Sequence, residues 1–240
     1  MPGRFAVISP PETIRAFFGY SETPDFPPRF NIAPTQPIPV VTAAAYSQGV
    51  DRHFNLMRWG FLPGFVKDPK TFSLIINARA ETLTEKPSFR AAVKRRRCLV
   101  IADGFYEWVR GPNRTSRSFL VRRPDRGPMG LAGLYETWSD PSGGEIDTAC
   151  IVTTPPNRLI ATIHDRMPAI IEPRDFHFWL DNDGVEAFAA TALLRPAPED
   201  ALELFEVSND VNRVANDDPT VQQPISSPVK PLGKGQGELF

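Results

Sequence analysis

The sequence predicts an α+β fold: a single domain built on a mainly antiparallel, barrel-like β-sheet with flanking helices. β-rich runs recur along the chain and helical patterns interrupt them irregularly, so the order is neither a βαβ alternation nor purely β. With 240 residues, 41% of them hydrophobic, the chain can bury one sizeable core. We expect this domain over residues 1–225, followed by a flexible or weakly docked tail at 226–240, where Pro, Gly, Lys and Gln accumulate.

The elements follow from local signals in chain order. Ser9-Pro10-Pro11-Glu12 has the form of a capping box that opens a helix, and Gly19 supplies its stop. A proline-rich connector follows at Pro24–Pro39. The expected strands, rich in β-branched and aromatic residues, are Val40–Ala44, Phe54–Trp59, Leu74–Asn77, Cys98–Glu107, Ser118–Val121, Gly130–Thr137 and Thr148–Thr153. The expected helices, with apolar residues at helical spacing, are Ala80–Val93, Asn157–Ile163, Pro173–Trp179 and Val185–Ala192.

Charge and cysteine content exclude several classes of protein. A formal net charge of -1 excludes a uniformly basic nucleic-acid binder, so any DNA contact would need basic residues segregated onto one face. Cys98 and Cys150 are too few for a disulfide scaffold, and both lie in apolar runs, which predicts two buried thiols in a reducing cytosol. Without a signal peptide or an apolar stretch of roughly 18 residues, we expect a cytoplasmic protein with no membrane partner.

Two ionisable residues are candidates for proton transfer. Glu107 lies among aromatic neighbours on an expected strand, where desolvation would raise its pKa; the alternative is a structural glutamate on a solvent face. His164 follows a short expected helix and precedes a loop, where a side chain can enter a cleft. His53 and His177 are isolated and the cysteines lie far apart, so we expect no zinc site and no other cofactor.

Polar and aromatic residues elsewhere suggest a DNA-binding groove. Asn77 ends an expected strand, where an asparagine ordinarily caps the next helix. Seven basic residues against two acidic ones lie between Arg79 and Arg97, either as a solvated helix face or as part of a phosphate-binding groove. Trp59 and Trp108 could stack on bases, although tryptophan in a strand is more often part of the core.

Several separate segments, in order from residue 1 to about 220, resemble the SRAP family (SOS response-associated peptidase). The members of this family are abasic-site processing proteins that crosslink to single-stranded DNA. The segments that carry the resemblance are Met1-Pro2-Gly3-Arg4, Arg29-Phe30-Asn31-Ile32-Ala33-Pro34-Thr35, Arg58-Trp59-Gly60-Phe61-Leu62-Pro63, Ile76-Asn77-Ala78-Arg79-Ala80-Glu81-Thr82, Asp103-Gly104-Phe105-Tyr106-Glu107-Trp108, Ile163-His164-Asp165-Arg166-Met167-Pro168 and Val207-Ser208-Asn209-Asp210-Val211-Asn212.

The resemblance implies roles for particular residues. Residue 2 would be the nucleophilic position, Glu107 the general acid/base, His164 an aid to sugar-ring opening or reversal, and Asn77 a positioning hydrogen bond. It also implies a monomer that binds single-stranded or junction DNA containing abasic sites. The DNA-contacting residues would be Arg4, Asn31, Trp59, Arg79, Trp108 and Arg166, with the arginines holding phosphates.

Residue 2 departs from the family pattern, because it is Pro2 where the family has cysteine. In the family, loss of the initiator methionine exposes a cysteine whose amine and thiol close a stable thiazolidine ring on the abasic aldehyde. Proline has no thiol and cannot form that ring. Its secondary α-amine could still form an iminium, as lysine forms Schiff bases, so a DNA lyase is an alternative to the family's crosslinking.

Three alternatives to the iminium lyase remain open at this point. One is a protein that binds single-stranded or junction DNA without chemistry. Another is an ordinary family member that was disabled when Pro2 was introduced by cloning or engineering. The third is a peptidase, after the family name; however, ordinary removal of Met1 would suffice to expose residue 2, and the chain has no Gly-x-Ser-x-Gly motif.

Overall fold

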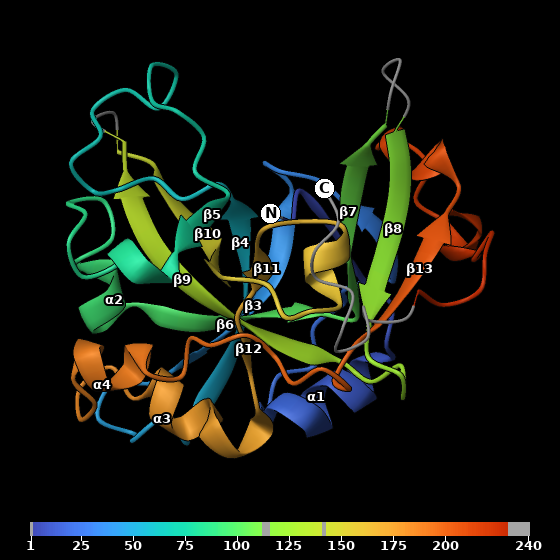
Figure 1. Cartoon of the computed structure of the whole chain (residues 1–240). Coiled ribbons are helices and arrows are strands. Elements are labelled where there is room, and N and C mark those ends of the chain that lie inside the picture. The colour runs from blue at the N-terminus through green and yellow to red at the C-terminus, as the bar shows by residue number, and fades with distance from the viewer. Residues whose placement is uncertain (1, 112–115, 141–142, 230–240) are drawn as a thin grey trace.

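The computed structural model of the chain describes residues 2–111, 116–140 and 143–229, and these form two β-sheets around a shared core (Figure 1). The first sheet has eight strands. They are β3 (Pro37–Ala43), β4 (Arg52–Trp59), β5 (Asn77–Arg79), β6 (Arg97–Ala102), β9 (Met129–Ser139), β10 (Glu145–Thr154), β11 (Met167–Pro168) and β12 (Ile170–Ile171).

Five strands of this sheet close into a barrel. β4 pairs with β3, β3 with β6, β6 with β9, β9 with β10, and β10 again with β4. The pairing is antiparallel except where β10 runs parallel to β4 and to β5. A closed sheet has no free edge along the barrel, so the α+β, barrel-like prediction is confirmed.

The second sheet is antiparallel, with the order β13, β8, β7, β1, β2. Its strands are β1 (Arg4–Val7), β2 (Arg29–Ile32), β7 (Gly104–Arg110), β8 (Ser116–Arg122) and β13 (Glu203–Val207). Phe5 and Phe105 belong to the same buried cluster as the barrel strands. The two sheets therefore pack as one domain.

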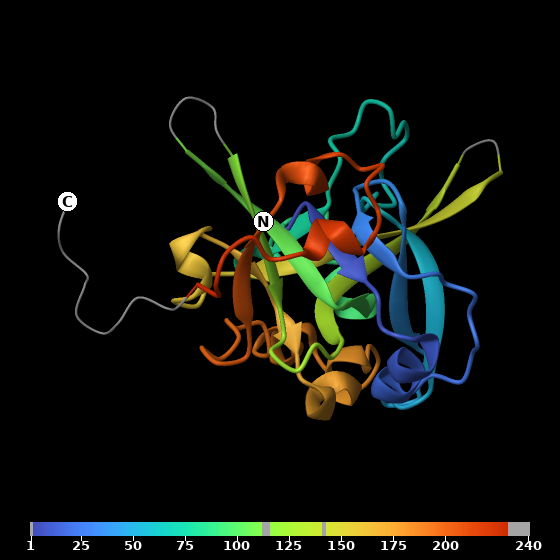
Figure 2. The same ribbon diagram turned by 90° about the vertical axis from the view of Figure 1, so that its right-hand side faces the viewer.

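The helices are short. The α-helices are α1 (Pro11–Phe18), α2 (Ala92–Arg95), α3 (Phe176–Leu180) and α4 (Ala187–Thr191). The 3-10 turns are η1 (Ala80–Thr82), η3 (Ile160–Thr162), η4 (Pro173–Asp175), η5 (Asn209–Asn212) and η6 (Pro219–Gln222). α1 and α3 lie below the sheets in both views (Figures 1 and 2).

Asp103 joins the two sheets and corrects the prediction of one strand over Cys98–Glu107. β6 ends at Ala102 and β7 begins at Gly104 in the other sheet. The Asp103 carboxylate accepts hydrogen bonds from the backbone N–H groups of Ile8 and Ser9 and from the Ser9 hydroxyl. The predicted capping box is therefore wrong, because the Ser9 side chain binds Asp103 and α1 has no side-chain cap.

Two further element predictions are wrong in detail. Ala80–Val93 is not one helix but η1, a series of turns and the start of α2, because Pro87 lacks the N–H that a continuous helix needs at its middle. The strand expected at Leu74–Asn77 starts only at Asn77, and Ile75 makes an isolated bridge to Phe61. Gly19 does end α1, in the left-handed conformation with φ 70°.

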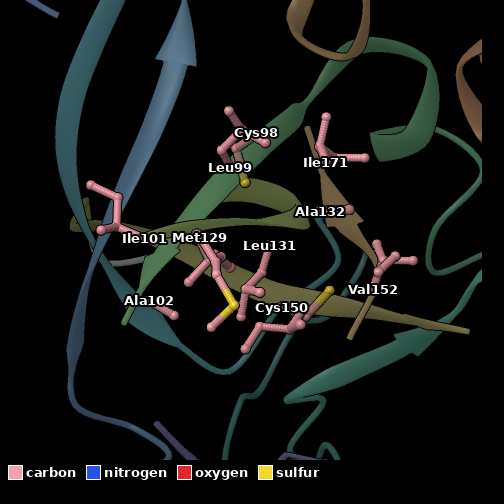
Figure 3. Close-up of a cluster of buried hydrophobic side chains, with 14 of the residues drawn as sticks. Cys98, Leu99, Ile101, Ala102, Met129, Leu131, Ala132, Cys150, Val152 and Ile171 are labelled. Carbon is pink, nitrogen blue, oxygen red and sulfur yellow. The ribbon is translucent and has the colours of Figure 1, made fainter. Parts of the chain in front are cut away.

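Both cysteines lie in the barrel core, as predicted. Cys98 and Cys150 are fully buried free thiols among aliphatic side chains (Figure 3), and burial raises the pKa of both. Within the tail predicted at 226–240, the Val229 N–H donates to the Leu204 carbonyl at the edge of β13. Residues 230–240 of the predicted tail lie outside the described residues.

Within the described ranges, no helix is both long and apolar enough to span a membrane.

Candidate active site

The strand pairing brings four distant positions towards the start of β1. The register of β1 and β7 puts Arg4 opposite Tyr106, the residue before Glu107. β5, which begins at Asn77, and β11, which follows His164, both pair with β10. Residue 2 therefore lies where the second sheet meets the barrel.

Asn77 holds residue 2 through a direct hydrogen bond. Its side-chain N–H donates to the carbonyl oxygen of Pro2 at 3.0 Å, and Pro2 is buried. The prediction that Asn77 caps a helix is wrong, because the cap position of η1 is Arg79. The Asn77 Oδ1 atom is buried and has no hydrogen-bond partner among the described residues. It can therefore accept a hydrogen bond from a ligand.

Glu107 is a buried carboxyl group, not the solvent-facing glutamate of the structural alternative. Its side chain is 3% exposed. Burial raises its pKa, because the charged form loses hydration, while the positive charges of the chain's amino terminus and of His164 act in the opposite direction. A carboxyl group with a raised pKa exchanges protons more readily near neutral pH.

His164 faces Glu107 across the site. Its Nε2 atom lies 3.9 Å from Glu107 Oε2, and its side chain is 25% exposed. On the other side of the ring, Nδ1 accepts a hydrogen bond from the backbone N–H of Arg166 at 2.9 Å. This N–H favours the neutral tautomer with its proton on Nε2, towards Glu107, whereas the Asp165 carboxylate, 2.9 Å from Nδ1, favours the other. This geometry suits transfer of a proton between Glu107, His164 and a bound molecule.

Arg166 and Arg79 lie next to this cluster, and only Arg79 is exposed. Arg166 donates two hydrogen bonds to the Glu81 carboxylate, at 2.6 and 2.9 Å, and a third to the Thr153 carbonyl. A phosphate would therefore have to compete with Glu81 for it. No role was predicted for Glu81 from the sequence, although it lies in the same segment, residues 76–82, as Arg79.

Arg4 and Asn31, both predicted to contact DNA, form hydrogen bonds within the protein. Arg4 donates to Asn31 Oδ1 and to the Val211 carbonyl, each at 2.9 Å. Asn31 is fully buried, and its amide donates to three carbonyls in the segment that follows β13. DNA contact by Asn31 is excluded in this conformation, because both ends of its side chain are already bound to protein.

The two predicted stacking tryptophans differ. Trp59 is fully buried; it donates to the Ile76 carbonyl and packs edge-on against Phe5, so it belongs to the core and cannot stack on a base. Phe61 and Leu62 are buried as well. Trp108 is half-buried and donates to Asn212 Oδ1 at 2.6 Å, which leaves part of its ring accessible.

The basic run does not form one face. Arg97 is fully buried and donates to backbone carbonyls, including those of Val93 and Trp179. Arg79 and Lys86, by contrast, border an open groove of about 740 Å³ that starts at Asn77. The groove is lined by Leu74, Ile75, Ile76, Asn77, Arg79, Lys86, Ser88 and Phe89. Cationic rims beside apolar floors suit a nucleic-acid strand.

Replacing Glu107 by glutamine is expected to stabilise the fold at neutral pH. A raised pKa means that the folded state holds its proton more tightly than the unfolded state, so the stability of the wild type falls as pH rises from about 4.5 through the folded pKa. Glutamine does not ionise. The Tm advantage of Glu107→Gln should be absent near pH 4 and reach roughly 2–4 °C at pH 8. Calorimetry across this pH range checks it; an advantage independent of pH would contradict it.

In the described part of the chain, no group of three or more His, Cys, Asp or Glu side chains could hold a metal ion. Asn77 contacts the Pro2 carbonyl, Glu107 and His164 lie 3.9 Å apart, and the groove of about 740 Å³ is lined in part by Asn77.

The barrel, the attached sheet and the arrangement around residue 2 define a protein of the SRAP class. The family model for SOS response associated peptidase (SRAP) matches residues 1–214. The chain belongs to the SRAP family.

Similar proteins support this assignment. The abasic site processing protein YoqW of Bacillus subtilis is 36% identical over 222 residues, which cover 91% of this chain and 97% of YoqW. The abasic site processing protein HMCES of Xenopus tropicalis is 29% identical, over 81% of this chain and 65% of HMCES. A crystal structure of a protein from Bacteroides thetaiotaomicron shares the fold with a TM-score of 0.80 at 24% identity, over 92% of this chain and 99% of that one.

Proposed function

We propose that this protein processes abasic sites in single-stranded DNA and does so through the α-amine of Pro2. Relatives that match nearly the whole chain are named abasic site processing proteins. The observation that carries the proposal is the setting of residue 2. Asn77 holds its carbonyl, and the neighbouring strand carries a buried glutamate opposite a histidine.

The reaction begins once Met1 has been removed, which leaves Pro2 with a secondary amine. A free α-amine has a pKa of about 8, so a useful fraction is neutral at physiological pH. The nitrogen adds to the aldehyde carbon of the ring-opened abasic sugar. Loss of water from this adduct then gives an iminium ion joined to Pro2. His164 or Glu107 supplies the proton that leaves with the hydroxyl group as water.

The iminium acidifies the hydrogens on the adjacent sugar carbon. Glu107 accepts one of them, the electron pair forms an enamine, and the phosphate on the next carbon leaves with the C–O bond electrons. The DNA strand is cleaved by β-elimination. Water then hydrolyses the unsaturated iminium, which releases the sugar aldehyde and restores the Pro2 amine. No oxidant, metal or organic cofactor takes part in these steps.

This chemistry differs from the permanent crosslink of a cysteine at residue 2. A thiazolidine needs an amine and a thiol on the same residue, and proline has only the amine. The expected product is therefore a transient covalent complex and a cleaved strand. Peptidase action in this scheme is limited to exposing residue 2, for which ordinary removal of Met1 suffices.

Borohydride trapping tests the proposal. Protein shown by intact mass to lack Met1 is mixed with single-stranded DNA that carries one abasic site, with or without borohydride. Borohydride reduces an iminium to a stable amine, so we expect a denaturation-resistant adduct only when it is present. Strand cleavage should appear when borohydride is omitted.

The controls separate chemistry from binding. DNA with a tetrahydrofuran in place of the abasic sugar has no aldehyde and should give neither adduct nor cleavage. Salt-sensitive binding of equal strength to both DNAs, with no adduct on the abasic one, would favour a binding protein without catalysis. Absence of a trapped adduct from protein that lacks Met1 would falsify the iminium mechanism.

The groove beside Asn77 supplies the proposed DNA contact. Arg79 is exposed on its rim, and removing one phosphate contact lowers the salt dependence of single-strand binding by about 0.7 in the slope of log K against log salt. We expect this decrease for Arg79→Gln, with weaker binding to every sequence tested. Arg174, on η4 on the helical side of the sheets, is 76% exposed and serves as the matched control. Equal slopes for the two variants would refute the groove as the DNA path.

A further inference from the structure

The ring nitrogen Nδ1 of His164 has two neighbours that require opposite proton positions. The backbone N–H of Arg166 donates to it at 2.9 Å, which requires a lone pair on Nδ1. The Asp165 carboxylate also lies 2.9 Å from Nδ1, and a hydrogen bond to it would require a proton there. The balance between these two neighbours therefore contributes to which ring nitrogen carries the proton of neutral His164.

The Arg166 peptide is fixed by the contacts of its own side chain. The side chain is 12% exposed, and its guanidinium donates to both oxygens of Glu81 and to the Thr153 carbonyl. A bidentate arginine–carboxylate pair is short and directional, so it limits movement of the chain that carries it. Met167, the next residue, pairs with Thr154 of β10. The N–H that points at His164 is thus held from both sides.

Asp165 has the weaker position. Its side chain is 86% exposed, so water competes for its carboxylate and screens its charge. The Arg166 N–H is the stronger partner of Nδ1 because it is held rigidly. This rigidity depends on Glu81, the one carboxylate that the Arg166 guanidinium contacts within the described residues.

We infer that Glu81, acting through Arg166, is a positioning residue that selects the His164 tautomer with its proton on Nε2. This tautomer presents an N–H to Glu107, 3.9 Å away, where it favours the ionised carboxylate that can accept a proton. The other tautomer presents a lone pair to Glu107 and favours the protonated carboxyl. The consequence for catalysis rests on the proposed function, whereas the tautomer itself does not.

Nitrogen-15 NMR of the imidazole rings measures the tautomer directly. The chain has only three histidines, and His164→Gln identifies the signals of His164. In wild-type protein at a pH where the ring is neutral, Nδ1 should show the shift of an acceptor nitrogen and Nε2 that of a protonated one. In Glu81→Gln we expect the ratio of the two tautomers to move roughly fivefold towards Nδ1–H, the effect of about one hydrogen bond.

Three further variants make the result specific. Asp165→Asn removes the competing carboxylate and should move the ratio towards Nε2–H. Combining it with Glu81→Gln should return the ratio towards the wild-type value. Glu206→Gln is the matched control, because Glu206 forms a bidentate pair with Arg117 on β8, away from the site. It should leave the signals of His164 unchanged.

Each outcome decides the inference separately from the proposed function. An unchanged tautomer ratio in Glu81→Gln would overturn the inference, whatever the protein does to DNA. A shifted ratio supports it even if borohydride traps no adduct in the wild type, in which case only the proposed function fails. A shifted ratio together with a three- to tenfold slower β-elimination, at unchanged DNA affinity, supports both.

Discussion

Replacing Pro2 by cysteine is expected to turn a borohydride-dependent adduct into one that survives denaturation without any reductant. Cysteine supplies the thiol that proline lacks, and the amine and thiol together close a thiazolidine on the aldehyde. The structure brings three of the proposed partners to this region, because Asn77 contacts the Pro2 carbonyl and Glu107, one residue after the partner of Arg4, faces His164. Denaturing gels with abasic single-stranded DNA should show near-complete crosslinking for Pro2→Cys and almost none for the wild type.

Pro2→Ala is the matched control for this experiment. It has a primary amine and no thiol, so it should behave as the wild type does: trapped by borohydride and otherwise reversible. If Pro2→Cys, confirmed to lack Met1, fails to crosslink, residue 2 is not the nucleophilic position of this protein. That result would contradict the arrangement of the site and not only the role of proline.

The second large effect is expected at Glu107. Glutamine keeps the shape of the side chain but cannot accept a proton, and loss of a positioned general base typically slows a reaction by about 10²- to 10⁴-fold. We expect Glu107→Gln to slow β-elimination by this factor while DNA affinity stays within about twofold. Single-turnover cleavage of abasic DNA measures the rate, and binding to tetrahydrofuran DNA measures the affinity.

Glu136 provides a matched control for Glu107. It is also a buried glutamate whose pKa is raised by desolvation, but it pairs with Arg96 on the barrel, away from residue 2. Glu136→Gln should cleave abasic DNA at the wild-type rate. Equal losses for both variants would show that Glu107 acts through stability and not as a base. Because Glu107→Gln is expected to raise Tm, a loss of activity in this variant would not come from a loss of stability.

The sequence was most informative about the strands, because alternating and β-branched runs depend on short-range patterns. The long strands β9 and β10 lie where expected. The strand pairing that closes the barrel could not be predicted from the sequence. The parallel pairing of β10 with β4 and β5 joins segments that are far apart in the chain. The helix predicted at 80–93 does not form. The prediction relied on the helical spacing of apolar residues, but Pro87 interrupts the helix.

The site was predictable where the resemblance named residues, and less so where a role depended on burial. Glu107 and His164 do face each other, and Asn77 does contact residue 2. Trp59 and Asn31 also lie in segments that carry the family resemblance, yet their side chains face the interior. The sequence does not show which side of a strand faces a cleft when both sides are covered. Glu81 was counted only as an acidic residue in the basic run, because its contact with Arg166 joins segments that are far apart in the chain.

The central claim is that the α-nitrogen of Pro2 bonds to the abasic sugar. Peptide mapping of the borohydride-reduced complex by mass spectrometry tests it most directly, using protein that lacks Met1. The account predicts that the reduced sugar is attached to the N-terminal peptide at the nitrogen of Pro2. Attachment to a lysine such as Lys86 on the groove, or an N-terminal peptide free of adduct, would contradict it.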